Sequence, residues 1–258
     1  MMSMNKQQLP QEVLRLASQH QLGMFEKEYP GKPDDEFAYL VSGLLFTLLG
    51  LYCLISNDAS AGGVLVILGL ILSLPYFISF VHFSLRRRRR SYLYEHGLVL
   101  AKCQQKQIVA AETIHWRDIA IIWHQIISQG TGVTPTITHL YSLQRRNGSI
   151  FGESLGEEKI TDAELGNRME RMALRYLFPE AVLTHQRGLP IPFGPLTIEP
   201  TGIKYEGQIL PWHLFDSLEI DEKLVIRQRE KGVWAKMSLA EIPNPALLRE
   251  LTYHLADA

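Results

Sequence analysis

The sequence predicts an α+β membrane protein with a two-helix transmembrane hairpin near its N-terminus and a mostly β region after it. Two observations carry this prediction. Residues 37–85 hold a single formally charged side chain, Asp58, whereas the flanking sequence is charged throughout. After residue 90 the chain alternates short strand patterns with turn residues. A chain of 258 residues has room for two small domains after the hairpin.

Two uncharged runs, 37–56 and 61–85, are each long enough to cross a hydrocarbon core of about 30 Å at about 1.5 Å per helical residue. Only the polar residues 57–60 separate them, which predicts an antiparallel hairpin in the lipid bilayer. Five arginines follow the second run, and these are Arg86, Arg87, Arg88, Arg89 and Arg90.

The arginine run predicts the orientation of the hairpin. Because the connecting turn contains no Lys or Arg, the positive-inside rule places the arginines and both termini in the cytoplasm. We therefore expect a multi-pass protein of the cell membrane (inner or plasma membrane), with the arginines at the membrane surface as a topology determinant. Selective binding of anionic headgroups by the same arginines is the alternative interpretation.

Residues 1–36 are expected to form a cytoplasmic N-terminal segment. Pro10 suits a first helical turn and Gly23 suits a stop. Apolar residues between them fall on one helical face, which predicts a short amphipathic helix. The polar start of the chain gives no sign of a secretion signal.

The region after the arginines predicts a series of strands followed by a helix. Asn147-Gly148 is a two-residue hairpin signal. From residue 162 to residue 177 apolar residues recur with helical spacing, Thr161 and Glu164 suggest a capping box, and Pro179 is expected to end the helix. The expected strands are 97–102, 107–111, 118–125, 139–145 and 149–151.

The same order of elements then recurs. A Pro- and Gly-rich stretch, 188–195, suggests a boundary or a constrained loop. Asn244 is expected to cap a closing helix over 245–255, with Pro245 at its first position. The expected strands are 196–199, 202–205, 208–210, 215–220, 224–229 and 233–237.

The two halves share a weak internal repeat. A glycine enters a strand in each, at Gly97 and at Gly202, and each then has an apolar-x-Trp-x-x-apolar step that contains Trp116 or Trp212. Both tryptophans are expected to anchor cores. The shared order of elements, more than any single match, indicates a duplication.

This pattern resembles bacterial pleckstrin-homology-like (PH-like) membrane proteins, in which a two-helix hairpin precedes a PH-type barrel. Most members of that group are uncharacterised. The resemblance implies tandem partly open antiparallel β-barrels, each closed by a C-terminal helix. The expected domains are an N-terminal segment at 1–36, the hairpin at 37–85, a first PH-like domain at 86–180 and a second at 188–258.

No motif in the sequence indicates catalysis, a metal or a cofactor. The nine histidines show no His-Glu-x-x-His spacing, and Cys53 and Cys103 form no Cys-x-x-Cys pair. The loop at 130–132 lacks the context of a phosphate-binding loop. We therefore expect a protein that is not an enzyme and that needs no cofactor, with an enzyme of unknown chemistry as a third alternative.

Charge limits the partners of the region after residue 90. This region has 17 Lys and Arg against 20 Asp and Glu, a net charge of 17 − 20 = −3, which is unfavourable for binding nucleic acid. Two local basic groups are candidate contacts for lipid headgroups or for a partner, with solvated strand surface as the alternative. They are Arg145 and Arg146, and Lys223, Arg227, Arg229 and Lys231.

These observations predict a membrane-anchored, non-enzymatic module that docks a protein partner or scaffolds an assembly at the cytoplasmic face. An exposed sheet edge and a groove beside a helix both suit peptide docking. A reader of anionic lipid headgroups is the second hypothesis. The sequence leaves the identity of the partner and the existence of a homo-oligomer open.

Overall fold

The computed structural model describes residues 9–30, 52, 88–104, 107–129, 136–156 and 159–256. The chain divides into two compact units. One comprises Met1–Tyr29, Ser91–Leu100 and Ala111–Ala258, and the other comprises Pro30–Arg90 and Ala101–Ala110. Of the described residues, Pro30, Tyr52, 88–90, 101–104 and 107–110 belong to the second unit, and all others belong to the first.

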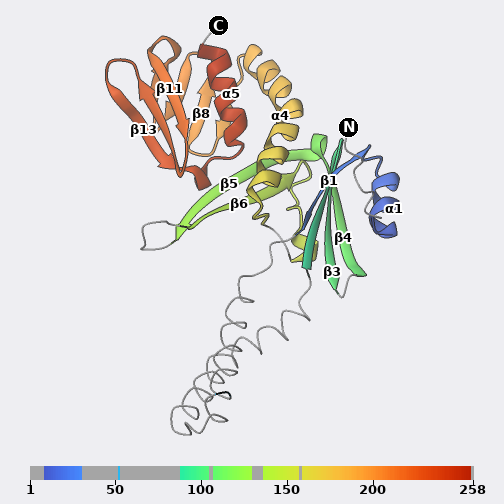
Figure 1. Cartoon of the computed structure of the whole chain (residues 1–258). Helices are drawn as coiled ribbons and strands as arrows, with labels where there is room; N and C mark the ends of the chain where they lie inside the picture. The colour runs from blue at the N-terminus through green and yellow to red at the C-terminus, as the bar shows by residue number, and fades with distance from the viewer. Residues whose placement is uncertain are drawn as a thin grey trace, which may run out of the picture. The chain divides into compact units, whose positions relative to one another are not determined.

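The first half of the described chain is largely β structure (Figure 1). It begins with α1 and ends with the long helix α4. The elements are α1 (Gln11–Gln19), β1 (Phe25–Pro30), β2 (Arg88–Tyr94), β3 (Gly97–Gln104), β4 (Gln107–His115), the 3-10 helix η1 (Trp116–Asp118), β5 (Ile119–Gln129), β6 (Thr136–Arg145), the 3-10 helix η2 (Glu153–Leu155) and α4 (Ala163–Gln186).

The second half repeats this progression from strands to a final helix. Its elements are β7 (Ile191–Phe193), β8 (Leu196–Glu199), β9 (Gly202–Tyr205), β10 (Gln208–Pro211), the 3-10 helix η3 (Trp212–Leu214), β11 (Phe215–Ile220), β12 (Lys223–Gln228), β13 (Gly232–Ser238), the 3-10 helix η4 (Leu239–Glu241) and α5 (Pro245–Ala256).

The described strands form four sheets, ordered β1-β2-β3-β4, β5-β6, β10-β9-β8-β7 and β11-β12-β13. The strands β5 and β6 form a long antiparallel pair. Asn147-Gly148 follows β6 and turns the chain back along it, and there the Gly148 N–H donates to the Arg145 carbonyl at 2.9 Å. Isolated bridges extend the outer edge of β6, at Tyr141 with Ile160 and at Gln144 with Ile150. The first half therefore has a sheet of four strands and one of two, and the second half has four and three.

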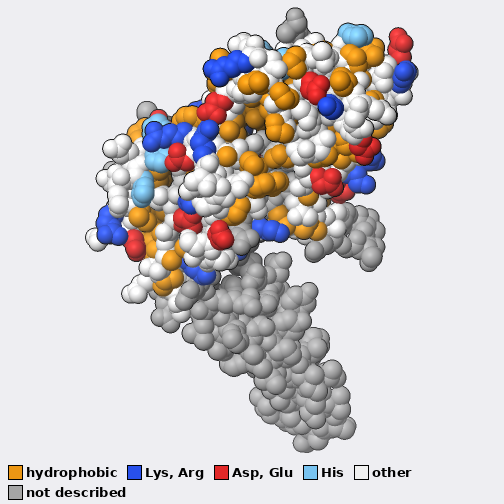
Figure 2. Space-filling view, turned by 180° about the vertical axis from the view of Figure 1, so that it is seen from behind, with side chains coloured by type: hydrophobic (Ala, Val, Ile, Leu, Met, Phe, Trp, Pro, Cys, Tyr) orange, Lys and Arg blue, Asp and Glu red, His pale blue; other side chains and the backbone are white. Residues whose placement is uncertain are grey.

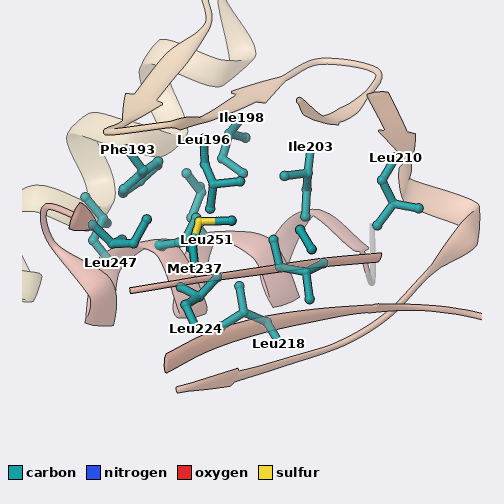
Figure 3. Close-up of a cluster of buried hydrophobic side chains, with 14 of the residues drawn as sticks. Phe193, Leu196, Ile198, Ile203, Leu210, Leu218, Leu224, Met237, Leu247 and Leu251 are labelled. Carbon is teal, nitrogen blue, oxygen red and sulfur yellow. The ribbon is translucent and has the colours of Figure 1, made fainter. Parts of the chain in front are cut away.

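The core of the second half lies between its two sheets and α5 (Figure 3). Side chains from all three layers converge in this core. Full burial of each large apolar side chain contributes about 1.5–3 kcal/mol. The labelled members are Phe193, Leu196, Ile198, Ile203, Leu210, Leu218, Leu224, Met237, Leu247 and Leu251.

Helix α4 begins one residue later than its sequence predicts and runs past its proline. Asp162, and not Thr161, is the N-cap, and its carboxylate accepts from the Leu165 N–H at 2.9 Å. Pro179 lies inside the helix. Beyond it Ala181 joins the core of the second half, and this burial offsets the hydrogen bond that proline removes.

The tryptophan step has the same local geometry in both halves. The Trp116 Nε1–H donates to the Glu95 carbonyl at 3.1 Å, and the Trp212 Nε1–H donates to the Pro200 carbonyl at 3.1 Å. In each case the acceptor lies two residues before the glycine that enters the strand. A Cβ on Gly97 or on Gly202 would collide with the carbonyl of the residue two before the tryptophan.

Asn244 joins the second half to the edge of β5. Its N–H donates to the Ile122 carbonyl and its Oδ1 accepts from the Ile122 N–H, both at 2.7 Å, while its Nδ2 donates to the Ala120 carbonyl at 3.0 Å. Its φ of 53° lies in the left-handed region that asparagine tolerates. The Asn244 side chain therefore pairs with a strand and does not cap α5 as predicted from sequence.

Among the described residues, no helix combines the length and the apolar character that crossing a membrane requires. Helices α1 and α5 have 9 and 12 residues, too few for a core of about 30 Å. Helix α4 has 24 residues, but charged side chains recur along its turns.

The predicted fold class, keywords and location are corrected by this finding. The described chain is an α+β protein of antiparallel sheets and three helices, and the predicted transmembrane hairpin is not among its described elements. The prediction of a multi-pass protein of the cell membrane is wrong for the same reason. The two predicted spans, 37–56 and 61–85, lie outside the described residues except for Tyr52.

Candidate functional site

A surface groove of about 250 Å³ lies between α4 and α5, and we call it the α4–α5 groove. Leu174 and Phe178 give it apolar lining, and both pack against the core of the second half. They are four residues apart, so their side chains lie on one face of α4. The remaining lining residues are Arg171, Arg175 and Pro179 from α4 and Glu250 from α5.

The charges around the groove are unevenly paired. Glu250 Oε1 lies 3.3 Å from Nη2 of Arg249. Arg171 and Arg175 are exposed, and neither makes an ion pair or a side-chain hydrogen bond with another described residue. The groove therefore combines apolar lining with two guanidinium groups that are open to solvent.

A buried polar cluster lies where the β5–β6 hairpin meets α4. The His124 and Tyr141 rings are cross-strand neighbours and stack with centroids 4.2 Å apart. His124 Nε2 lies 3.0 Å from His139 Nδ1, and His124 Nδ1 lies 3.6 Å from Glu170 Oε1. The last distance exceeds that of a hydrogen bond.

Helix α4 approaches this cluster closely because Gly166 has no side chain. A Cβ at Gly166 would overlap the Tyr141 ring. The Tyr141 hydroxyl donates to Asn167 Oδ1 at 3.1 Å. Burial, reinforced by the Glu170 carboxylate, holds the pKa of Tyr141 well above its ordinary value, so this hydroxyl keeps its proton.

The cluster holds α4 against the hairpin through the Tyr141–Asn167 hydrogen bond and the close approach at Gly166. Its members are only partly paired, because Glu170 Oε1 is buried without a hydrogen-bond partner in the described chain. Among the residues that the structure describes, no group of three or more His, Cys, Asp and Glu side chains is placed to hold a metal ion. Histidine spacing along the sequence gave no indication of the cluster, because cross-strand register brings its members together.

The first predicted basic group is engaged within the protein. Arg145 Nη2 lies 2.6 Å from Glu112 Oε1, with the two side chains 22% and 13% exposed, and it also donates to the Thr113 carbonyl at 2.9 Å. Arg146 donates to both carboxylate oxygens of Glu180 at 2.8 Å. These guanidinium groups hold β6 to β4 and to α4.

The second predicted basic group lies on β12, which contains Lys223 and Arg227, and in the turn before β13, which contains Arg229 and Lys231. Arg227 pairs across strands with Glu219, with Nε 2.9 Å from Oε1. This hydrogen bond raises the pKa of Arg227 and lowers that of Glu219. Lys223, Arg229 and Lys231 are exposed, and within the described chain they have no carboxylate within ion-pair distance.

The arginine run is only partly described. Arg86 and Arg87 lie outside the described residues, and Arg88, Arg89 and Arg90 begin strand β2. Burial lowers the pKa of Arg89. The end of the run is therefore part of a sheet, and its predicted role as a topology determinant at a membrane surface stays a prediction.

The visible surface is mixed in character. Figure 2 shows hydrophobic side chains interspersed with both positive and negative ones on that face, and no broad area of one charge stands out. This face therefore offers no broad area of positive charge to an anionic membrane or to nucleic acid.

The fold and the groove define an α+β protein with an amphipathic surface groove between two helices. The chain belongs to a family of unknown function (DUF6585), whose model matches residues 2–257. Neither the curated proteins nor the solved structures contain a match to it.

Proposed function

We propose that this chain is a non-enzymatic module that docks a segment of a protein partner in the α4–α5 groove. The observation that carries the proposal is the pair Leu174 and Phe178, which are only partly covered at the junction of two helices. Partly exposed apolar side chains that line a groove are typical of peptide-docking surfaces.

The size of the groove favours a side chain of a partner over a small-molecule ligand. Its volume of about 250 Å³ is below the range of about 300–1,000 Å³ that is usual for small-molecule and cofactor sites. One or two anchoring side chains from a partner segment suit this volume, and such anchors supply most of the binding energy at protein interfaces.

The groove is built on rigid elements, which favours a preformed docking site. Leu174 and Phe178 pack against the core of the second half, together with Leu177 and Val182 from the same helix. A site whose supporting residues are fixed by packing loses little conformational entropy when a partner binds.

The contacts of the predicted basic residues support docking over headgroup recognition. Arg145 and Arg146 each hold a carboxylate of this chain, and headgroup binding would have to break these pairs. The partly buried pair of Arg145 with Glu112 is costly to break, because removal of one partner leaves the other charge poorly solvated.

Photocrosslinking in the source cells tests the proposal. A benzophenone side chain is placed at Glu250, the exposed α5 residue that lines the groove, and, as a control, at Lys236, which is exposed on β13 between the buried Ala235 and Met237. We expect one adduct that forms at position 250 and not at position 236. Equal labelling at both positions, or no adduct at position 250, contradicts the proposal.

The partner that is identified is then purified, and its Kd is measured with two matched variants of α4. Phe178→Ser removes an apolar group of the groove, whereas Tyr176→Ser changes an exposed aromatic residue, 38% exposed, that does not line it. We expect Phe178→Ser to weaken binding at least about tenfold, as is typical for loss of an anchor. Tyr176→Ser is expected to leave Kd unchanged, and equal effects of the two variants would exclude the groove.

A further inference from the structure

We infer that the partner segment is acidic and apolar, and that Arg171 and Arg175 select its acidic residues. This inference rests on the proposed function of the α4–α5 groove. It assigns to the two arginines the recognition of carboxylates that flank the side chain bound at Leu174 and Phe178.

Arg171 and Arg175 differ in their pairing from six other arginines of the described chain. Those six have a carboxylate oxygen within 4 Å of the guanidinium, namely Arg117, Arg145, Arg146, Arg168, Arg227 and Arg249. The exposed Arg229 also has no such carboxylate among the described residues, but it does not line the groove. Glu164 and Glu180 lie on the same helix as Arg171 and Arg175. Glu164 pairs with Lys27, however, and Glu180 pairs with Arg146.

The two arginines also oppose each other within α4. Like charges four residues apart on a helix destabilise it by a few tenths of a kcal/mol. Both arginine side chains are exposed, so covering the apolar core does not explain why two arginines stand at these positions. An acidic partner removes this repulsion and adds charge-assisted hydrogen bonds, which are bidentate for arginine with carboxylate.

The opposite wall does not offer an equivalent site for a basic partner. Glu250 is the one acidic residue among the groove's described lining residues, and it already lies beside Arg249. A basic segment would meet two unpaired cations and one paired carboxylate, whereas an acidic segment would meet complementary charge.

The spacing of the arginines suggests the spacing of the acidic residues. Residues four apart on one helix face have Cβ atoms about 5–6 Å apart. Carboxylates two residues apart in an extended segment, at about 3.3 Å per residue, lie at a similar separation. We therefore expect two acidic residues close to a large apolar residue in the bound segment.

A random peptide library displayed on phage tests the inference with the full-length chain. It is panned on the wild type, on Arg171→Glu/Arg175→Glu, and on Lys231→Glu/Lys236→Glu as a control with the same change of net charge at exposed sites of the second half. A synthetic peptide of the sequence enriched on the wild type is then titrated into all three proteins at low and high salt.

We expect the wild type and the control to enrich peptides with acidic residues beside an aromatic residue or leucine. The groove double variant is expected to bind the synthetic peptide at least about tenfold more weakly, and salt is expected to weaken wild-type binding, because these ion pairs are exposed.

Three outcomes would overturn the inference in distinguishable ways. Enrichment of neutral or basic peptides that still depends on Phe178 would refute the acidic partner and leave the docking function standing. A lack of any enriched peptide would refute the docking function itself. Binding of the wild type to vesicles with phosphatidylglycerol, lost in the groove double variant without peptide enrichment, would assign the arginines to lipid and refute both.

Discussion

The two halves of the molecule contain the same tryptophan step in different surroundings. Trp116 and Trp212 each donate to a backbone carbonyl two residues before a strand-entering glycine, at the same distance of 3.1 Å. Trp116 is fully buried, whereas Trp212 remains partly exposed. The local hydrogen bond follows from the repeated spacing along the chain, but burial depends on what packs over it.

Helix α4 accounts for much of this difference. It contacts the 3-10 helix η1 that contains Trp116, and its later turns contribute Ala181 to the core of the second half. One helix thus serves both halves. The second half closes its own core with α5 and leaves Trp212 at the surface.

The largest expected difference between the halves comes from removing the two indoles. Trp116→Ala creates a cavity in a close-packed core and is expected to lower the free energy of unfolding by about 3–5 kcal/mol. Trp212→Ala removes one hydrogen bond and part of a buried surface. It is expected to lower the free energy of unfolding by about 1–2 kcal/mol. Urea unfolding of the full chain measures both, and equal losses would show that the two steps are equally buried.

Replacing the two strand-entering glycines tests what the halves share. In Gly97→Ala the new Cβ meets the Ile114 carbonyl, and in Gly202→Ala it meets the Leu210 carbonyl. Overpacking against backbone is expected to cost about 1–3 kcal/mol in each half. A loss in one half alone, measured by the same unfolding curves, would indicate that the repeat is not structural.

The joint between the halves depends on Asn244. Asn244→Gly keeps a residue that accepts the positive φ of 53° but removes the side chain that bonds Ile122 and Ala120. We expect a loss of about 1–2 kcal/mol and faster hydrogen exchange at the Ile122 amide. Asn244→Asp keeps the acceptor for the Ile122 N–H but loses the donor to the Ala120 carbonyl, so the Ile122 amide is expected to stay more protected than in Asn244→Gly. Unchanged exchange in Asn244→Gly would contradict this account of the joint.

The smallest expected effects come from exposed ion pairs. The Lys27 ammonium donates to both Glu164 oxygens at 2.6 and 2.7 Å, and this bond lowers the pKa of Glu164. A carboxyl group whose pKa is lower in the folded state than in the unfolded state stabilises the fold at pH values above its unfolded-state pKa. This stabilisation is lost as the pH falls through its folded-state pKa. In Lys27→Met the Glu164 midpoint in a carboxylate NMR titration is expected to rise, and an unchanged midpoint would rule out the pairing.

Alternation and turn residues were sufficient to predict much of the second half. Strands β8, β9 and β11 have the predicted bounds, because their buried and exposed residues alternate or are framed by turn glycines. Strand β7 was missed because Pro192 and Pro195 suggested a boundary. It is the edge strand of its sheet, where proline removes no ladder hydrogen bond that the sheet needs.

Long-range packing explains the errors in the first half. The prediction that Pro179 ends α4 was wrong because burial of Ala181 in the second core compensates for the lost hydrogen bond. The transmembrane prediction was based on length and lack of charge in a window, which do not by themselves determine the structure of a segment. It is contradicted by the helices of the described chain, which are too short or too charged to cross a membrane.

The groove was only partly foreseeable from the sequence. A groove beside a closing helix was expected, but the candidate contacts Arg145, Arg146 and Arg227 proved to be paired within the protein. Arg171 and Arg175 were missed because helical periodicity places them on a solvated face. Only the approach of α5 to α4 makes that face one side of a groove.

Side-chain footprinting of the full chain with and without its partner tests the docking function most directly. Carbene labelling reports the solvent access of individual side chains. We expect the partner to protect Leu174, Phe178 and Glu250 while labelling of exposed Val233 on β13 stays unchanged. Protection at Val233 with unchanged labelling of the groove would contradict the account and place the docking surface on the sheet.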